Sequence, residues 1–226
     1  MMKSGIDQDA LVTMFSQATA KQGEALRKAV SEATLKALQG RELTLQNIRS
    51  VLKSVTSAAS AGAAKNPASA LDVEAMLTKA FAGMDAALLQ AVEANRKALQ
   101  QFVDGGVGLT EKPMKEALAN LEKMEDVFFA AVGKAAQGAG GPMQGPWTHV
   151  LDAMKVKGTN TGAQAASTVE AMMTQTKTAL RDSRAMGVRT AQALLDSYAA
   201  LVSGVLIGMS EGLQQGGAAK PPTSKK

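Results

Sequence analysis

The sequence predicts an all-α fold, an elongated antiparallel helical bundle or coiled coil that ends in a very long C-terminal helix. Two observations support this prediction. Apolar residues recur every three or four positions along almost all of the 226 residues, and no segment alternates as a strand does. Alanine and methionine are frequent, while aromatic residues make up only 3% of the chain. Such side chains suit a thin layer between closely spaced helices better than a broad core.

Residues 1–137 are predicted to form four helices. The first spans Gln8–Leu38 and ends at Gly40, because glycine commonly follows the last turn of a helix. We expect its buried side to consist of Leu11, Phe15, Ala18, Ala25, Ala29 and Ala33. The second spans Glu42–Ser60, and the loop Ala61–Pro67 follows it. We expect its buried side to consist of Leu45, Ile48, Leu52, Val55 and Ala59.

The third predicted helix, Ser69–Val103, has the most regular pattern. Its apolar positions alternate between steps of three and four, which is typical of coiled coils. We name this stripe the helix seam; alanines aside, it consists of Leu77, Phe81, Met84, Leu88, Asn95 and Phe102. We expect the seam to be buried and its one polar member, Asn95, to fix the register. The short connections at Gly40 and Gly105–Pro113 predict antiparallel pairing of the helices that they join.

The fourth predicted helix runs from Pro113 to Ala136, since proline suits the first turn of a helix. Residues 138–147 are rich in glycine and proline and predict a linker or crossover. A short helix, Thr148–Val156, follows it. Residues 148–213 are predicted to belong to the same bundle, although the sequence leaves open whether the break separates two domains.

The last predicted helix, Ala163–Leu213, is too long to be stable alone, so we expect it to lie along a partner and the chain to form a homo-oligomer. Its C-terminal apolar face consists of Leu194, Tyr198, Leu201, Val202, Val205 and Met209. Beside it lies a small-residue ridge of Ala200, Gly204, Gly208 and Gly212. Glycine inside a helix costs about 1 kcal/mol relative to alanine. We therefore expect the ridge to pack closely against a second copy or against the Ser69–Val103 helix.

The formal net charge of +5 is unevenly distributed, with nine basic and five acidic residues in 141–226. Residues 214–226 are predicted to be a disordered basic tail that contains Lys220, Lys225 and Lys226. The start, MMKSGIDQDALV, lacks the apolar run of a secretion signal. The uncharged run Ser197–Ser210 is shorter than the ~20 residues that span a bilayer. We expect a cytoplasmic protein without a transmembrane span.

Residue types that catalysis and metal binding require are scarce in this chain. It has no cysteine and one histidine, His149. The spacing of His149 and Asp152 fits a base with its orienting carboxylate, and it equally fits the surface pair that we favour. Glu122, Glu125 and Asp126 lack the histidine that a carboxylate metal site adds, so we interpret them as a solvated face. We predict no enzyme activity and no catalytic, cofactor-binding or metal-binding residue.

Composition and local sequence together indicate a family resemblance. The chain is alanine-rich and cysteine-free, contains the segments MFSQATAKQGEALRKAV and AVEANRKALQQFVDGG, and carries the basic stretch AAKPPTSKK. In these features it resembles the phasins, bacterial proteins that coat polyhydroxyalkanoate granules. The resemblance implies a non-enzymatic amphiphile that self-associates through coiled coils and covers a polyester surface. The break at Gly138–Pro146 departs from the phasin pattern, and an uncharacterised bacterial family of similar composition is the alternative.

We therefore predict a non-enzymatic interaction or coat protein that self-associates and binds an apolar surface, storage-granule polyester or lipid, through amphipathic helices. Granule association in the cytoplasm follows from the phasin resemblance. The alternative is a nucleic-acid-associated helical protein whose basic tail contacts phosphates. Three tail lysines neutralise only about three phosphates, and such binding weakens as salt rises. Binding through apolar area is insensitive to salt screening, so salt distinguishes the two hypotheses.

Overall fold

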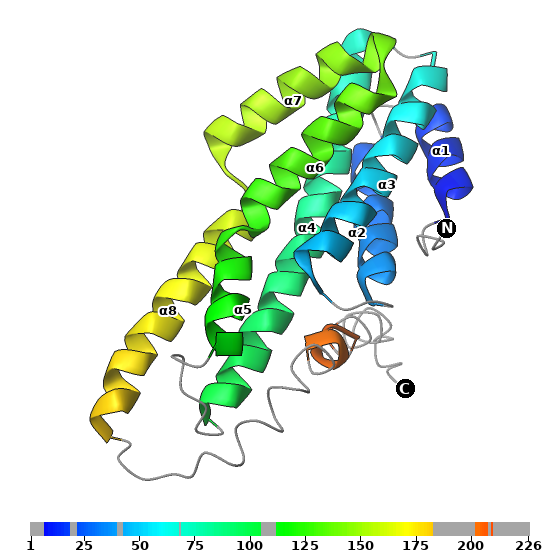
Figure 1. The fold of residues 1–226 in the computed structure, drawn as a ribbon. Helices are drawn as coiled ribbons and strands as arrows, with labels where there is room; N and C mark the ends of the chain where they lie inside the picture. The colour runs from blue at the N-terminus through cyan, green and yellow to red at the C-terminus, as the bar shows by residue number, and fades with distance from the viewer. Residues whose placement is uncertain are drawn as a thin grey trace, which may run out of the picture.

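The computed structural model describes residues 7–18, 22–39, 43–67, 69–104, 112–182, 202–207 and 209. The elements are α1 (Gln8–Gln17), α2 (Gly23–Gln39), α3 (Leu45–Lys65), α4 (Ala70–Asp104), α5 (Lys112–Glu122), α6 (Met124–Ala139), the 3-10 turn η2 (Gly141–Met143), α7 (Gln144–Lys157) and α8 (Asn160–Asp182) (Figure 1). Residues 202–207 are also helical, and with Met209 they are called the C-terminal segment. The described residues contain no strand, so the predicted all-α fold is confirmed.

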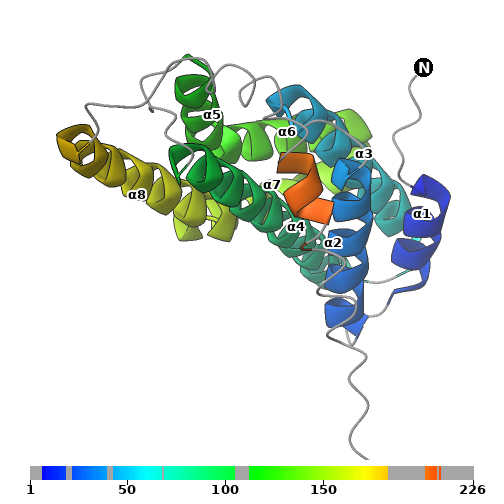
Figure 2. The same cartoon turned by 90° about the horizontal axis from the view of Figure 1, so that it is seen from below.

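The helix α4 lies at the centre of the structure, between α2 and α8 (Figure 2). The most extensive contacts between described helices join α2 to α4, α3 to α6 and α1 to α3. All six residues of the helix seam lie in α4 and are buried. The Nδ2 atom of Asn95 donates to the carbonyl oxygen of Ala91, 2.9 Å away and one turn back in the same helix. That bond by itself sets no register with another helix.

The helices from α2 to α4 reverse direction at each connection, but the pair that packs most extensively is not antiparallel. α2 and α3 are antiparallel, as are α3 and α4 (Figure 1). α2 and α4 run parallel, because Glu24 pairs with Lys79 and Val30 lies further along both helices, beside Gly83. The expectation of antiparallel pairing is therefore wrong for this pair. A short connection sets the direction of the next helix, but it does not decide which helices share the largest apolar face.

Two glycines allow helices to approach one another closely. A Cβ atom on Gly83 of α4 would lie 2.5 Å from the carbonyl oxygen of Arg27 and 2.9 Å from the Cβ atom of Val30, both in α2. A Cβ atom on Gly62 of α3 would lie 2.6 Å from the carbonyl oxygen of Val12 in α1. Protein interiors are close-packed, so a side chain at either position would push the two helices apart.

The first predicted helix, Gln8–Leu38, is wrong as a continuous element. α1 and α2 are separate helices, and Ala18 after α1 is extended. The Nδ2 atom of Asn66, which follows α3, donates to the carbonyl oxygens of Phe15 and Ala18 at 2.7 and 2.9 Å. These bonds satisfy the end of α1 where it packs on α3. The buried side of α2 differs from the predicted one and includes Leu26, Val30, Thr34, Leu35, Ala37 and Leu38.

Two other predicted helix boundaries differ from the structure. α3 continues to Lys65, through most of the predicted loop Ala61–Pro67, because Gly62 packs against α1. The predicted helix Pro113–Ala136 is divided into α5 and α6 at Lys123, whose φ of −83° and ψ of −5° depart from helical values. Backbone hydrogen bonds to and from Lys123 persist, so this division is a kink and not a loop.

Residues 138–147 form a tight turn and the start of a helix, where the sequence predicts a linker. The end of α6, the η2 turn and the first residues of α7 occupy them. Gly140 and Gly141 have φ values of 64° and 50°, in the left-handed region that favours glycine. Trp147 is fully buried, and its indole N–H donates to the Oγ atom of Ser60 in α3 at 2.9 Å. This bond attaches α7 to the first half of the chain.

The predicted helix Ala163–Leu213 is not confirmed as one element. α8 is described from Asn160 to Asp182, and the C-terminal segment lies beside α2 and α4, away from the axis of α8 in both views (Figures 1 and 2). No straight helix passes through both. The C-terminal segment buries Val202 and Leu206 in the core, and this apolar contact is available only away from the axis of α8.

Candidate functional site

The C-terminal segment contains the described part of the predicted C-terminal apolar face. Val202 is 1% exposed, and Val205 and Met209 are partly buried against the core. Leu206, which the prediction leaves out, is fully buried. The remaining members lie outside the described residues: Leu194, Tyr198 and Leu201. In the structure, the described face therefore packs on the bundle.

An open hollow of about 550 Å³ lies between the C-terminal segment and α4. Its lining combines two cations, two amides and two apolar side chains: Arg96, Lys97, Gln100, Gln101, Val205 and Met209. The Nε atom of Arg96 is paired with Glu93 of the same helix at 3.0 Å. The Oγ atom of Ser203, in the C-terminal segment, donates to the carbonyl oxygen of Gln39 at the end of α2, at 3.4 Å. The segment is therefore held mainly by apolar contacts and has an open space along one edge.

Gly204 is the one described member of the predicted small-residue ridge. It is exposed, and a Cβ atom there would meet no atom within 4 Å. Among the described residues, the glycines that lie against the backbone of a neighbouring helix are Gly62 and Gly83 instead. The other ridge residues and the tail lysines lie outside the described residues: Ala200, Gly208, Gly212, Lys220, Lys225 and Lys226.

Polar side chains attach the start of α8 to α4 and α6. We call this cluster the α8 joint, and it consists of Asp85, Glu125, Thr159, Asn160 and Thr161. Asp85 Oδ2 accepts hydrogen bonds from the backbone and side-chain nitrogens of Asn160 at 3.1 and 2.9 Å. Asp85 Oδ1 accepts one from the backbone of Thr161 at 3.0 Å. The buried Asp85 carboxylate thereby satisfies N–H groups that have no partner within the first turn of a helix.

Glu125 of α6 is the second carboxylate of the α8 joint. Its Oε1 atom accepts hydrogen bonds from the backbone nitrogen and the Oγ1 atom of Thr159, at 3.0 and 2.6 Å. A Cβ atom on Gly162 would overlap this carboxylate, so a side chain there would displace it. The interpretation of Glu122, Glu125 and Asp126 as a solvated face is wrong for Glu125, because α8 begins against this part of α6.

Beyond the joint, α8 packs on α4 and α5, and few of its described side chains there are large and apolar. Its described buried residues there are Ala165, Thr168, Val169 and Met172. Among the described atoms, Thr168 Oγ1 of α8 is buried without a hydrogen-bond partner. An unsatisfied buried polar atom costs about 1–3 kcal/mol. The Nε2 atom of Gln164 donates to Glu93 Oε1 of α4, so the interface beyond the joint is partly polar.

The two members of the predicted His149–Asp152 pair have other partners. His149 Nδ1 lies 3.2 Å from Glu74 Oε2 of α4, and Asp152 pairs with Lys155 at 3.5 Å. The described part of the chain contains no group of three or more side chains arranged to hold a metal ion. None of the described helices combines the length and hydropathy needed to cross a membrane.

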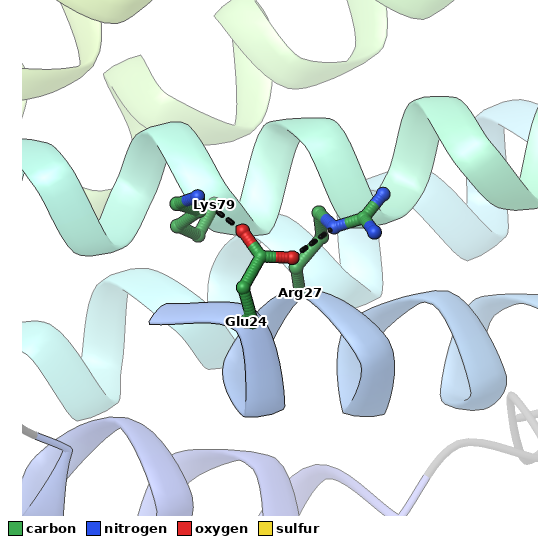
Figure 3. A network of polar contacts seen from close by, with 3 residues as sticks. All are labelled: Glu24, Arg27 and Lys79. Carbon is green, nitrogen blue, oxygen red and sulfur yellow. Dashed lines mark hydrogen bonds and ion pairs between the residues drawn. The ribbon is translucent and has the colours of Figure 1, made fainter. Parts of the chain in front are cut away.

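Glu24, near the start of α2, holds its carboxylate between two cations (Figure 3). Lys79 of α4 donates to one oxygen, and the Nε atom of Arg27 donates to the other at 2.9 Å. The hydrogen bond from Lys79, and then that from Arg27, lowers the pKa of Glu24 below its ordinary value. The carboxylate is exposed, so its contribution to stability is small, but its pairing with Lys79 identifies the register of α2 on α4.

The α8 joint is the arrangement that sequence reasoning missed. One half of it has a local signal, because Thr159 and Asn160 are residue types that commonly precede or begin helices. The carboxylates of the joint have no local sequence signal that identifies their partners. Asp85 is a charged residue in an otherwise apolar stretch of α4, and its partner Asn160 lies 75 positions away. Only folding brings the two together.

Fold and site together define an all-helical protein in which a polar joint attaches α8 and apolar contacts attach the C-terminal segment. The chain belongs to the family of unknown function DUF6781, whose model matches residues 1–215. That match includes the α8 joint and the C-terminal segment. No curated protein and no solved structure matches the chain significantly.

Proposed function

We propose that this protein is a non-enzymatic interaction or coat protein that self-associates and binds an apolar surface, either storage-granule polyester or lipid, in the cytoplasm. The observation that supports the proposal is the C-terminal segment. It is a helical piece that keeps its apolar side on the bundle and leaves an open hollow along one edge. An amphipathic helix with such a face can lie in the plane of an apolar surface.

The C-terminal segment can exchange one apolar partner for another at low cost. Val202 and Leu206 are its two fully buried side chains. Burial of a large apolar side chain contributes roughly 1.5–3 kcal/mol, so detaching both costs roughly 3–6 kcal/mol. Insertion of the same side chains into lipid or polyester recovers a comparable amount. The predicted apolar residues that precede the segment add further area for the external surface.

Self-association is the second part of the proposal. Three large apolar side chains among the described residues are exposed: Val156 at 91%, Met173 at 50% and Ile207 at 38%. A second copy would cover such side chains, and coiled-coil contacts between copies would give an elongated assembly. We expect the mass measured by sedimentation equilibrium to rise with protein concentration. The mass of a single chain at every concentration would contradict this part.

Flotation with neutral-lipid droplets, and sedimentation with polyester granules and with DNA, test the binding proposal at low and high salt. We expect retention on droplets or granules at both salt concentrations, because apolar burial is insensitive to screening. The double variant Val205→Asp/Met209→Asp should lose most binding. Gly204→Asp is the matched control, because it adds a carboxylate to the exposed side of the same segment. Binding to DNA alone, lost at high salt, would establish the nucleic-acid alternative instead.

A further inference from the structure

The α8 joint is rich in hydrogen bonds to carboxylates, whereas the described interface beyond it has few large apolar contacts and a buried hydroxyl without a partner. We propose that α8 is a hinged arm: the α8 joint holds it on α4 and α5, and opening of the joint releases its apolar side for surface binding. The inference rests on the proposed function, to which it adds a second binding element and its control.

At the joint, several hydrogen bonds hold the N-terminal end of α8. Carboxylates from two different helices, Asp85 of α4 and Glu125 of α6, receive hydrogen bonds from three consecutive residues, 159–161. The Oγ1 atom of Thr161 also donates to the backbone oxygen of Asp85 at 3.0 Å. Hydrogen bonds to ionised groups are the stronger class, and they depend on precise geometry. Loss of either carboxylate should therefore weaken the attachment of the whole helix.

The interface beyond the joint favours docking much less. Thr168 Oγ1 of α8 is buried without a partner among the described atoms. This atom regains a hydrogen bond with water when α8 leaves its neighbours, so the released state relieves a penalty of the docked state. Val169 and Met172 are the only described large apolar side chains of α8 that docking buries. The balance between docked and released α8 is therefore sensitive to the joint.

The chain before α8 is suited to act as the hinge. Gly158 separates α7 from α8 with a φ of 75°, and a Cβ atom there would meet nothing within 4 Å. α7 is anchored independently, because buried Trp147 donates to Ser60 of α3. Rotation at Gly158 therefore moves α8 and leaves α7 in place. The released helix presents Val169 and Met172 beside Met173, which is already half exposed, as one apolar side.

Hydrogen exchange tests whether the joint holds α8. Asp85→Asn and Glu125→Gln remove the charge and keep the shape of each side chain. We expect each variant to reduce the protection of α8 amides by at least about tenfold, with the amides of α4 much less affected. Glu74→Gln is the matched control, because Glu74 also bridges α4 to a following helix but contacts His149 of α7. Equal protection of α8 in all four proteins, the wild type included, would overturn the proposal.

A chemical lock tests whether release of α8 serves surface binding. The chain has no cysteine, so two introduced thiols can be joined specifically by a short bifunctional reagent. Glu93→Cys/Gln164→Cys places them on side chains that touch across α4 and α8. Glu74→Cys/His149→Cys is the control pair, which links α4 to α7. We expect the first link to reduce binding to neutral-lipid droplets by at least about tenfold relative to the unlinked protein, and the control link to leave it unchanged.

The two experiments separate failure of the inference from failure of the proposed function. Locked and unlocked proteins that bind droplets equally well would refute the hinged arm and leave the surface-binding function intact. If no form binds droplets or polyester granules, the proposed function fails, and with it the role of release in binding. The exchange experiment would then still decide whether the joint controls α8. Folding of each variant is checked by the buried emission of Trp147, which lies outside the joint.

Discussion

α2 and α8 both lie on α4, and both run parallel to it, but they are attached by different means. α2 meets α4 at Gly83, where the backbone of one helix touches the other, and its buried side is almost entirely apolar. α8 is attached by carboxylates at its first turn and buries the unsatisfied hydroxyl of Thr168. One central helix thus supports both a permanent partner and a releasable one.

Among the described side chains, the apolar contribution to the two attachments differs by about a factor of two. α2 buries the large apolar residues Leu26, Val30, Leu35 and Leu38, whereas the described part of α8 buries Val169 and Met172. At roughly 1.5–3 kcal/mol for each large side chain, these amount to roughly 6–12 and 3–6 kcal/mol before the entropy of ordering is subtracted. α2 therefore belongs to the core of the fold, while α8 depends on its polar joint.

A charge inside α4 should have the largest effect, because this helix supports both partners. Leu88 and Leu99 are fully buried, and we expect Leu88→Asp/Leu99→Asp to cost several kcal/mol for each carboxylate and to abolish cooperative unfolding. Thermal and urea denaturation followed by circular dichroism measure this loss. Met173→Asp, at a half-exposed position, is the control and should change stability by less than about 0.5 kcal/mol. A double variant that melts like the wild type would refute the buried role of α4.

A methyl group at the closest approach of α2 and α4 should weaken the attachment of α2 and leave that of α8 unchanged. We expect Gly83→Ala to destabilise the protein by about 1–3 kcal/mol, because its Cβ atom would lie 2.5 Å from the backbone of Arg27. Gly204→Ala is the control; open space surrounds this helical glycine, and alanine should stabilise its helix by up to about 1 kcal/mol. Urea unfolding measures both changes, and equal effects would contradict the role of Gly83.

Two substitutions in α8 and its joint should change the stability of the protein in opposite directions. We expect Asp85→Asn to destabilise the protein by about 1–3 kcal/mol, because a charged acceptor of three hydrogen bonds is lost. Thr168→Val removes the unpaired hydroxyl and should stabilise by up to about 1 kcal/mol. Differential scanning calorimetry measures both. A destabilising Thr168→Val would show that the hydroxyl is satisfied in solution.

The smallest expected effect concerns pH and the contact of α2 with α4. The folded pKa of Glu24 is lower than its unfolded value, so its ionised form contributes stability above the ordinary carboxyl pKa. This contribution disappears as pH falls through the folded pKa. The loss should be absent in Glu24→Gln, and comparison of urea midpoints at neutral and acidic pH measures it. Identical acid dependence in wild type and variant would contradict the pairing with Lys79 and Arg27.

Local patterns in the sequence are enough to predict the fold class and the most regular helix. The predicted Ser69–Val103 agrees with α4 to within one residue at each end, and the helix seam within it is buried. Apolar spacing and the glycine and proline residues of Ala61–Pro67 and Gly105–Pro113 are local features, so one sequence suffices to interpret them. The same spacing identifies which side of a helix is buried but not which partner covers it.

The ends of the other helices and the surfaces on which they pack depend on contacts between residues far apart in the chain, which local patterns do not reveal. Asn66 ends α1 through Phe15, 51 positions earlier, and this contact divides a helix that periodicity alone predicts to be continuous. Asp85 selects the start of α8 from 75 positions away. The C-terminal segment lies on α2 and α4 because Val202 and Leu206 gain more from burial there than from continuing along the axis of α8. Helical propensity extends an element along its own axis, whereas burial and hydrogen bonding with distant residues determine where it stops and on what it packs.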